Sequence, residues 1–277
     1  MIKITALMDN KLSANRAMIA EHGLSMLIEK NGKRILFDCG QGKNTLFNTH
    51  KLGISLDNMD AVVLSHSHYD HSAGFRDWAE NNNKTKVLYT GINFFEKKYA
   101  QNGIKYTDLS GGFDEDFLNT YNIEREVIVD KKEIFDGIWI VGNFPRRYEF
   151  EAIPKRFVRD RAGSFINDDF SDEICIVIEN SDSVVVLVGC SHPGILNIVS
   201  YIKDVFNKPV TAIYGGTHLV EADEARINTT ITKLWELGVE VLGFSHCSGD
   251  KVEEILKSKN INSCHLGVGD IIFIDKN

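Results

Sequence analysis

The stretch SHSHYDH, residues 65–71, decides the fold prediction for this chain. It places three histidines and one aspartate within six positions, directly after an apolar run that has the pattern of a strand. The chain turns where a strand ends, so the side chains of His66 and His68 can point toward one centre. Asp70 and His71, just beyond, can face a second point nearby. Imidazole and carboxylate groups are ligands that suit zinc, iron or manganese, so the stretch predicts a metal site.

The alternative interpretation of residues 65–71 is a solvated, histidine-rich loop. Such loops seldom follow an apolar strand at this spacing. Buried imidazoles with a purely structural role would each need a hydrogen-bond partner for their ring nitrogens. We therefore favour metal binding.

Further histidines occur where later strands are expected to end. Each follows an apolar run: His192 after 184–188, His218 after 210–214 and His246 after 239–244. Glycine and serine lie beside these positions, and small residues let the backbone approach a metal closely. A single histidine after a strand is usually a capping or packing residue. Together with the first cluster, however, these positions predict that one rim of a sheet gathers the imidazoles.

The rest of the chain alternates between strand and helix patterns. Strands are predicted over 2–8, 24–29, 34–38, 61–65, 173–179, 183–188, 210–214, 239–244 and 270–274, and helices over 74–81, 195–206, 224–237 and 251–258. The opening strands are expected to form a β-meander whose fourth strand enters the histidine cluster. This alternation predicts an α/β fold, an αββα sandwich of two mixed β-sheets flanked by helices. We expect a single domain over 1–277, with an inserted lid-like region at about 93–172.

Composition limits the classes of function. The formal net charge of −8, from 31 Lys+Arg and 39 Asp+Glu, argues against a nucleic-acid partner because phosphate backbones favour basic surfaces. The amino terminus lacks a secretory pattern, and no apolar run is long enough to span a membrane. The five cysteines are scattered and include no CxxC, which predicts a reduced, cytoplasmic protein. The sequence is compatible with a homo-oligomer.

The 66–71 segment resembles the HxHxDH signature of the metallo-β-lactamase superfamily. The flanking Asp38-Cys39-Gly40 is similar to that superfamily's strand with an aspartate and a glycine turn. His192 and His246 fall where the family places its third and last histidine ligands. One branch of that superfamily resembles this chain more narrowly, in the segments GCSHPG (189–194), GGTHL (215–219) and HCSG (246–249). Its members are often labelled synthases of dihydropterin-linked ribofuranosylaminobenzene phosphate.

The resemblance implies two divalent transition metal ions, most simply zinc, with iron or manganese as alternatives. His66, His68 and His192 would hold the first ion. The second would be held by Asp70, His71 and His246, and Asp70 would also orient a water molecule and accept its proton. The family usually adds a carboxylate after a later strand, but residues 214–218 contain none. Cys190 or His218 is expected to substitute there, unless only one ion binds tightly.

Individual residues are candidates for contacts around the metal ions and the substrate. Asp38 is expected to accept a ligand N–H and so fix a histidine tautomer. His218 is also a candidate substrate contact. Arg146, beside Pro145, is our candidate for an anion contact because arginine forks suit phosphate or carboxylate. His22 is expected at the rim of the site, as a second candidate for substrate binding.

The predicted function is a metal-dependent hydrolase that acts on a small anionic molecule, a phosphoester or a related substrate. Carboxylic esters and lactones are alternative substrates. A synthase or transferase of pterin-type cofactor biosynthesis and a non-catalytic metal-binding sensor are the alternative functions.

Overall fold

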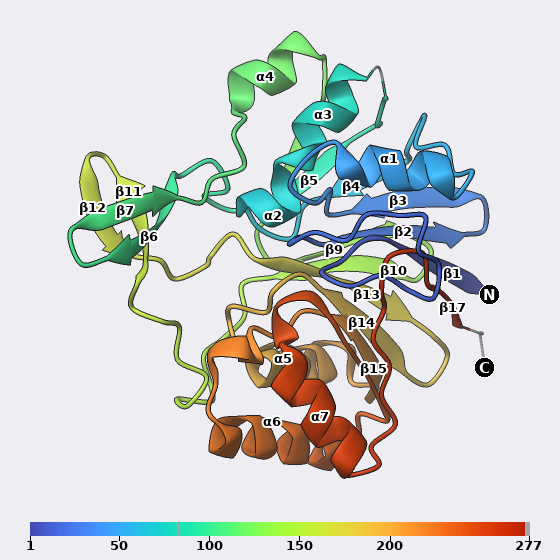
Figure 1. The fold of residues 1–277 in the computed structure, drawn as a ribbon, viewed down its shortest axis with the longest axis vertical. Helices are drawn as coiled ribbons and strands as arrows, with labels where there is room; N and C mark the ends of the chain where they lie inside the picture. Colours follow the sequence, from blue (N-terminus) through green and yellow to red (C-terminus); the bar gives the residue numbers. More distant parts are fainter. Residues whose placement is uncertain (82, 275–277) are drawn as a thin grey trace.

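The computed structural model describes residues 1–81 and 83–274 and has four layers of helix, sheet, sheet and helix (Figure 1). The predicted αββα sandwich is confirmed. One sheet lies beneath the helices at the top of Figure 1, and the other lies above those at the bottom. The N- and C-terminal strands lie together at one side, away from the projecting hairpins.

The first sheet is built largely from the N-terminal half of the chain. Within residues 1–81 and 83–274 it has seven strands, in the order β17 (Ile271–Ile274), β1 (Ile2–Met8), β2 (Ser25–Lys30), β3 (Lys33–Phe37), β4 (Ala61–Val63), β5 (Leu88–Gly91) and β8 (Arg125–Ile128). The first three strands in sequence are antiparallel, and β3 pairs with β4 in parallel. The expected meander therefore stops at β3. Helix α1 (Asn44–Lys51) provides the crossover that a parallel connection needs.

The second sheet carries the three later histidine loops. Its described strands follow the order β16 (Val241–Phe244), β15 (Val210–Gly215), β14 (Val184–Val188), β13 (Ile174–Glu179), β10 (Ile138–Gly142) and β9 (Lys131–Phe135). Strands β14, β15 and β16 are parallel, so their carboxyl ends lie at the same edge. The helices that cover this sheet are α5 (Ile195–Phe206), α6 (Glu224–Glu236) and α7 (Asp250–Ser258).

Three large apolar cores within the described residues hold the layers together, beside a small cluster of Met8, Met18 and Val268. The middle core joins the two sheets through side chains such as Phe37, Ile176 and Leu187. A second core lies between β13–β16 and helices α5 to α7. The third contains Phe75 and Trp78 of α3 (Gly74–Glu80), which pack on the outer face of the first sheet. The strands β4 and β14, which lead into His66 and His192, are buried on both faces, and this packing positions the loops that follow them.

The expected insertion at 93–172 is only partly separate from the sandwich. Its ends form a small projecting sheet in the order β12 (Ser164–Asn167), β11 (Phe157–Arg161), β6 (Lys98–Asn102) and β7 (Lys105–Asp108). The middle of the region, which includes β8, β9 and β10, belongs to the two main sheets. The boundaries 93–172 are therefore too broad, because irregular sequence concealed strands that complete the sandwich. Helix α4 (Glu115–Thr120) lies at the top of Figure 1.

Within the described residues, no helix has the length and apolar character needed to cross a membrane.

Candidate metal centre

The ends of four strands from the two sheets meet at one edge of the sandwich. The loop after β4 continues into the short helix α2 (Tyr69–Ser72), and the loops after β14, β15 and β16 bring in His192, His218 and His246. Gly189, the first residue after β14, allows the sheets to meet closely. A Cβ atom there would lie 2.1 Å from the Oγ atom of Ser65. The predicted convergence of the histidines at one rim is thus a feature of the structure.

The first group of candidate ligands contains His66, His68 and His192. One ligand atom from each lies within 4.8 Å of the others, and all three side chains are buried. The Nε2 atoms of His66 and His68 and both ring nitrogens of His192 have no hydrogen-bond partner among the described residues. Buried polar atoms are normally paired, so these orphan nitrogens fit a site for a cation.

The second group contains Asp70, His71, Cys190 and His246, and it meets the same 4.8 Å criterion. The Nε2 atom of His71 lies 3.1 Å from Cys190 Sγ and 3.1 Å from His246 Nε2. Asp70 Oδ2 lies 3.2 Å from His246 Nε2. Cys190, from the loop after β14, thus joins the second group of candidate ligands.

Hydrogen bonds on the far side of each ring fix the tautomers in the second group. Asp38 Oδ2 accepts from His71 Nδ1 at 2.6 Å, and Asn10 Oδ1 accepts from His246 Nδ1 at 2.9 Å. Each Nε2 atom then carries a lone pair, and these two lone pairs face each other across 3.1 Å. Such an arrangement is repulsive unless a cation, either a metal or a proton, lies between the rings. The residues present therefore fit a metal ion.

Asp38 also reaches the first group. Ser65 Oγ donates to Asp38 Oδ2 at 2.7 Å and lies 3.0 Å from His66 Nδ1, so it accepts the proton of that ring. The backbone N–H of Ser65 donates to Asp38 Oδ1 at 2.7 Å. Asp38 thus contacts His71 directly and His66 through Ser65.

Burial controls the charge of the first group. It lowers the pKa values of His66, His68 and His192 well below 6.5, so these rings are neutral and their lone pairs are available.

The pKa values in the second group shift differently, because this group contains a carboxylate and lies beside Asp38. Burial opposes charge on His71, but Asp38 and Asp70 raise its pKa to about 9. Burial also opposes charge on Asp70, yet His71, His22 and His246 hold its pKa well below the usual value. Burial raises the pKa of the Cys190 thiol well above 9.0. Without a metal, a proton on His71 would therefore fill the space between the rings.

Strained backbone is concentrated around the two groups. Five residues have φ between 49° and 58°, in the left-handed region that residues other than glycine and asparagine rarely adopt. They are Asp38, Phe170, Ser191, His218 and His246. Such strain persists where the surrounding structure holds a residue in place, and it is frequent at functional sites.

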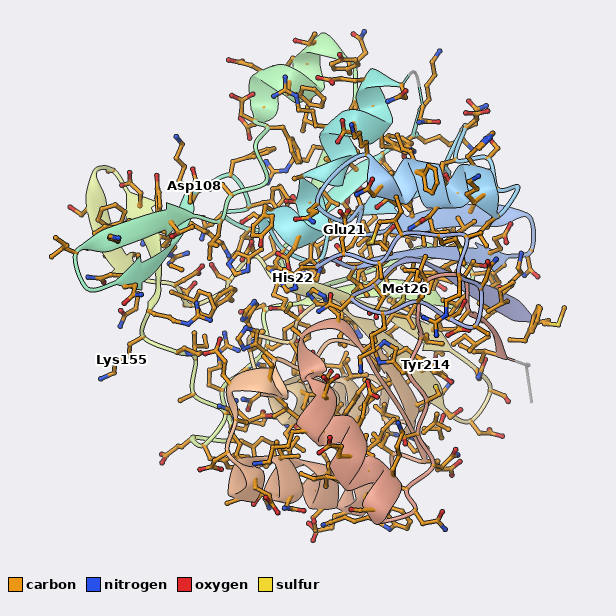
Figure 2. The ribbon with its side chains drawn as sticks, in the orientation of Figure 1. Glu21, His22, Met26, Asp108, Lys155 and Tyr214 are labelled. Carbon is orange, nitrogen blue, oxygen red and sulfur yellow. The ribbon has the colours of Figure 1, made fainter. Side chains whose placement is uncertain are left out.

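Both groups open onto one cavity of about 340 Å³. His22 lies at its rim, with Nε2 3.0 Å from Asp70 Oδ2 and its side chain about half exposed. Figure 2 shows His22 between the upper and lower halves of the molecule. His218 lines the cavity and contacts the His192 ring at 4.5 Å between centroids, but it belongs to neither ligand group. Burial lowers the pKa of His218 to about 4.

Arg146 is not part of the cavity wall, which corrects the expectation that it contacts the substrate anion. Its guanidinium donates to the backbone carbonyl of Asp169. The arginine that lines the cavity is Arg156, ten residues later, which pairs with Glu221. Arg146 therefore lies against the 168–172 segment.

A buried network, which no sequence motif predicted, lies behind the first group. Lys98 Nζ lies 2.5 Å from Asp172 Oδ1 and 3.1 Å from Asp168 Oδ2, and all three side chains are buried. Asp172 Oδ2 accepts from the N–H of Ser67 at 2.9 Å, which positions the loop between His66 and His68.

An aromatic ring connects this network to the ligands. Phe170 stacks on His192 with 3.8 Å between centroids, and Lys98 Nζ lies 4.4 Å from the centroid of the Phe170 ring. Glu173 accepts from the His192 N–H at 2.9 Å. Burial and Asp172 raise the pKa of Glu173 to about 8. The acidic run 168–173 before a buried strand was the available signal for this network, whereas Lys98 had none.

Comparison with known proteins identifies the class. The family model for the metallo-beta-lactamase superfamily matches residues 19–246, and the chain belongs to this superfamily. The resemblance drawn from residues 66–71 is therefore confirmed.

Individual relatives extend over nearly the whole chain. An uncharacterized protein of Methanocaldococcus jannaschii is 32% identical and covers 99% of this chain and 100% of its own length. The 7,8-dihydropterin-6-methyl-4-(beta-D-ribofuranosyl)-aminobenzene-5'-phosphate synthase of the same organism is also 32% identical, over 92% of this chain and 90% of its own. A crystal structure of a metal-dependent hydrolase of the beta-lactamase superfamily has a TM-score of 0.84 and 27% identity. That alignment covers 99% of this chain and 100% of the other.

Proposed function

We propose that this protein is a metal-dependent hydrolase with a dinuclear site that acts on a small anionic substrate, a phosphoester or a related molecule. The observation that carries the proposal is the pair of buried donor groups, with uncovered lone pairs, that open onto one cavity. The structural likeness to a metal-dependent hydrolase adds support.

The two donor sets support an assignment of the ligands. His66, His68 and His192 would hold one ion, and Asp70, His71, Cys190 and His246 the other. Imidazole, thiolate and carboxylate together favour zinc, with iron or manganese as alternatives. Bound divalent ions would polarise a phosphoryl or carbonyl oxygen and lower the pKa of a bound water far below its bulk value, toward about 7.

The residues of the chain supply the remaining functions. Asp70 is our candidate for orienting the attacking water and accepting its proton, because its carboxylate lines the cavity. His22 donates from Nε2 to Asp70 Oδ2, because its Nδ1 faces the amide nitrogen of Asn10 at 3.4 Å. Being half exposed, His22 gives the buried carboxylate a route to solvent. Arg156 and His218 line the cavity and are candidate contacts for an anionic substrate.

The test combines metal analysis with an activity screen. Purified protein is expected to contain about two transition metal ions per chain. It should hydrolyse bis(p-nitrophenyl) phosphate or one of a panel of phosphomonoesters, carboxylic esters and lactones. His68→Ala should reduce kcat/KM more than 100-fold, since even loss of an outer partner of a ligand costs about 10–100-fold. His50→Ala is the matched control because His50 is exposed on α1. Full activity in His68→Ala would overturn the proposal.

A synthase or transferase is the second candidate, and a specific observation favours it. The relative that is 32% identical over 92% of this chain is named a dihydropterin-linked ribofuranosylaminobenzene phosphate synthase. Coupling of a dihydropterin that bears a leaving group on its 6-methyl carbon to a phosphorylated aminobenzene ribofuranoside, with release of that leaving group and a proton and with no ester hydrolysis, would identify this reaction. Bound metal with neither activity would favour the metal-binding sensor.

A further inference from the structure

A second cavity adjoins the one above the metal ligands. It has a volume of about 400 Å³ and lies between residues 152–155 and the first turn of α6. The two cavities share His192, His218 and Glu221 in their walls. A substrate could therefore react over the metal ligands and extend past His218 into this second space.

Arg226 gives the second cavity its chemical character. Its side chain lines the cavity and is half-buried, and its Nε atom is buried without a hydrogen-bond partner. Within residues 1–81 and 83–274, only Arg226 and the exposed Arg16 lack a carboxylate or carbonyl partner for the guanidinium. The arginines that have one are Arg34, Arg76, Arg125, Arg146, Arg147, Arg156, Arg159 and Arg161. Arg226 thus holds its positive charge in a partly enclosed space without a hydrogen-bonded carboxylate, and the nearby Glu151 carboxylate interacts with it only through space.

The nearby carboxylates are already engaged. Glu221, in the wall of the cavity, pairs with Arg156. Glu151 accepts from the backbone N–H groups of Leu196 and Asn197 at 3.0 Å and 2.9 Å. Lys155 adds a second positive charge at the edge, and Figure 2 shows its side chain directed away from the body of the molecule. The cavity therefore offers a guanidinium whose N–H donors are not taken up by a carboxylate of the described residues.

We propose that this second cavity binds a phosphate group of the substrate, with Arg226 as its counter-charge. The planar guanidinium suits phosphate oxygens through paired N–H donors. The inference rests on the proposed function and specifies the substrate class: a molecule that carries a reactive ester and a separate phosphate. The ester lies over the metal ligands, and the phosphate lies on the other side of His218.

Binding of inorganic phosphate to the zinc-loaded protein tests the proposal. A ³¹P NMR titration should show one bound phosphate ion fewer per chain in Arg226→Gln than in the unmodified protein. Affinity at that site should fall about tenfold or more, because hydrogen bonds to charged groups contribute about 1.5–3 kcal/mol. Arg16→Gln is the control, since it removes an exposed arginine that has no partner. An unchanged number and affinity of bound phosphate ions in Arg226→Gln would overturn the proposal.

A second variant makes the test independent of one substitution. Glu221→Gln removes a negative charge from the shared wall and should tighten phosphate binding severalfold, whereas no change or weaker binding contradicts the proposal. The two proposals also fail separately. If Arg226→Gln loses the phosphate site but the unmodified protein hydrolyses no ester, the phosphate site is supported and the hydrolase is rejected. If turnover depends on His68 but phosphate binding is unchanged in Arg226→Gln, the hydrolase is supported and the phosphate site is rejected.

Discussion

Asp38 Oδ2 accepts a hydrogen bond from His71 Nδ1 at 2.6 Å, and both side chains are completely buried. The same carboxylate accepts from Ser65, which in turn accepts from His66. One acidic residue therefore orients a histidine in each of the two candidate ligand groups. Because acceptors of this kind set the tautomer of a ligand ring, Asp38 couples the two groups.

We predict that Asp38→Asn weakens metal binding. The amide can still accept from the Ser65 backbone N–H through one oxygen, but its NH2 group cannot accept from His71. Zinc affinity, measured by competition with a chromophoric chelator, should fall about 10–100-fold. Asp57→Asn, at an exposed position, should match the unmodified protein. Equal zinc affinity in Asp38→Asn would show that the His71 tautomer does not depend on this bond.

A second prediction concerns the ligand role of Cys190. Its Sγ atom lies 3.1 Å from His71 Nε2 within the second group. A thiolate bound to cobalt gives charge-transfer absorption in the near ultraviolet, so the cobalt-substituted protein should show this band. Cys190→Ser should lose the band and reduce the preference for zinc over manganese, because a hydroxyl is a harder ligand than a thiolate.

Cys264→Ser is the control for that experiment, since Cys264 is exposed. It should keep the band. A cobalt-loaded protein without thiolate absorption before any substitution would remove Cys190 from the ligand set.

Local signals in the sequence were sufficient to predict the sandwich and the convergence of the histidines at one edge. The strands that precede His192 and His218 are continuous apolar runs, and such runs form buried parallel strands. Their shared direction brings the following loops to one edge. The histidine spacing at 66–71 then determines which side chains share each ligand group.

Contacts between distant segments could not be predicted in the same way. Lys98 lies 74 residues from Asp172, and although an acidic run surrounds Asp172, nothing in the sequence around Lys98 indicates the pairing. Arg146 and Arg156 belong to similar basic surroundings in the sequence, yet only Arg156 lines the cavity. The direction of an irregular loop decides between them, and loop direction depends on tertiary contacts rather than on local composition.

The buried network around Lys98 leads to a prediction about stability. Lys98→Met would leave Asp168 and Asp172 buried without their cation, and breaking a buried pair in this way costs about 3–5 kcal/mol. Urea unfolding of the metal-loaded protein should show this loss. Lys97→Met, at the exposed neighbouring position, should change stability by less than about 0.5 kcal/mol. Similar unfolding midpoints for the two variants would mean that the network is not a source of stability.

Glu151 leads to a prediction about pH. Its buried carboxylate covers the N-terminus of α5, and burial raises its pKa from 4.5 to about 7 in spite of the two backbone N–H donors. A carboxyl group whose pKa is raised on folding binds more protons in the native state than in the unfolded state between these two values. The free energy of unfolding therefore falls as pH rises from about 4.5 to about 7, with a slope of at most about 1.4 kcal/mol per pH unit.

Glu151→Gln isolates this effect because glutamine does not titrate and keeps one carbonyl oxygen for the helix N–H groups. The stability of the unmodified protein relative to Glu151→Gln should be greatest near pH 5, decrease up to about pH 7 and stay constant above it. Other titrating groups, including the metal ligands, contribute equally to both proteins and cancel in the difference. Thermal melts of the two metal-loaded proteins between pH 5 and pH 8 measure that difference. If it were independent of pH, or grew as pH rises, the two N–H donors of α5 would outweigh burial and keep Glu151 ionised throughout.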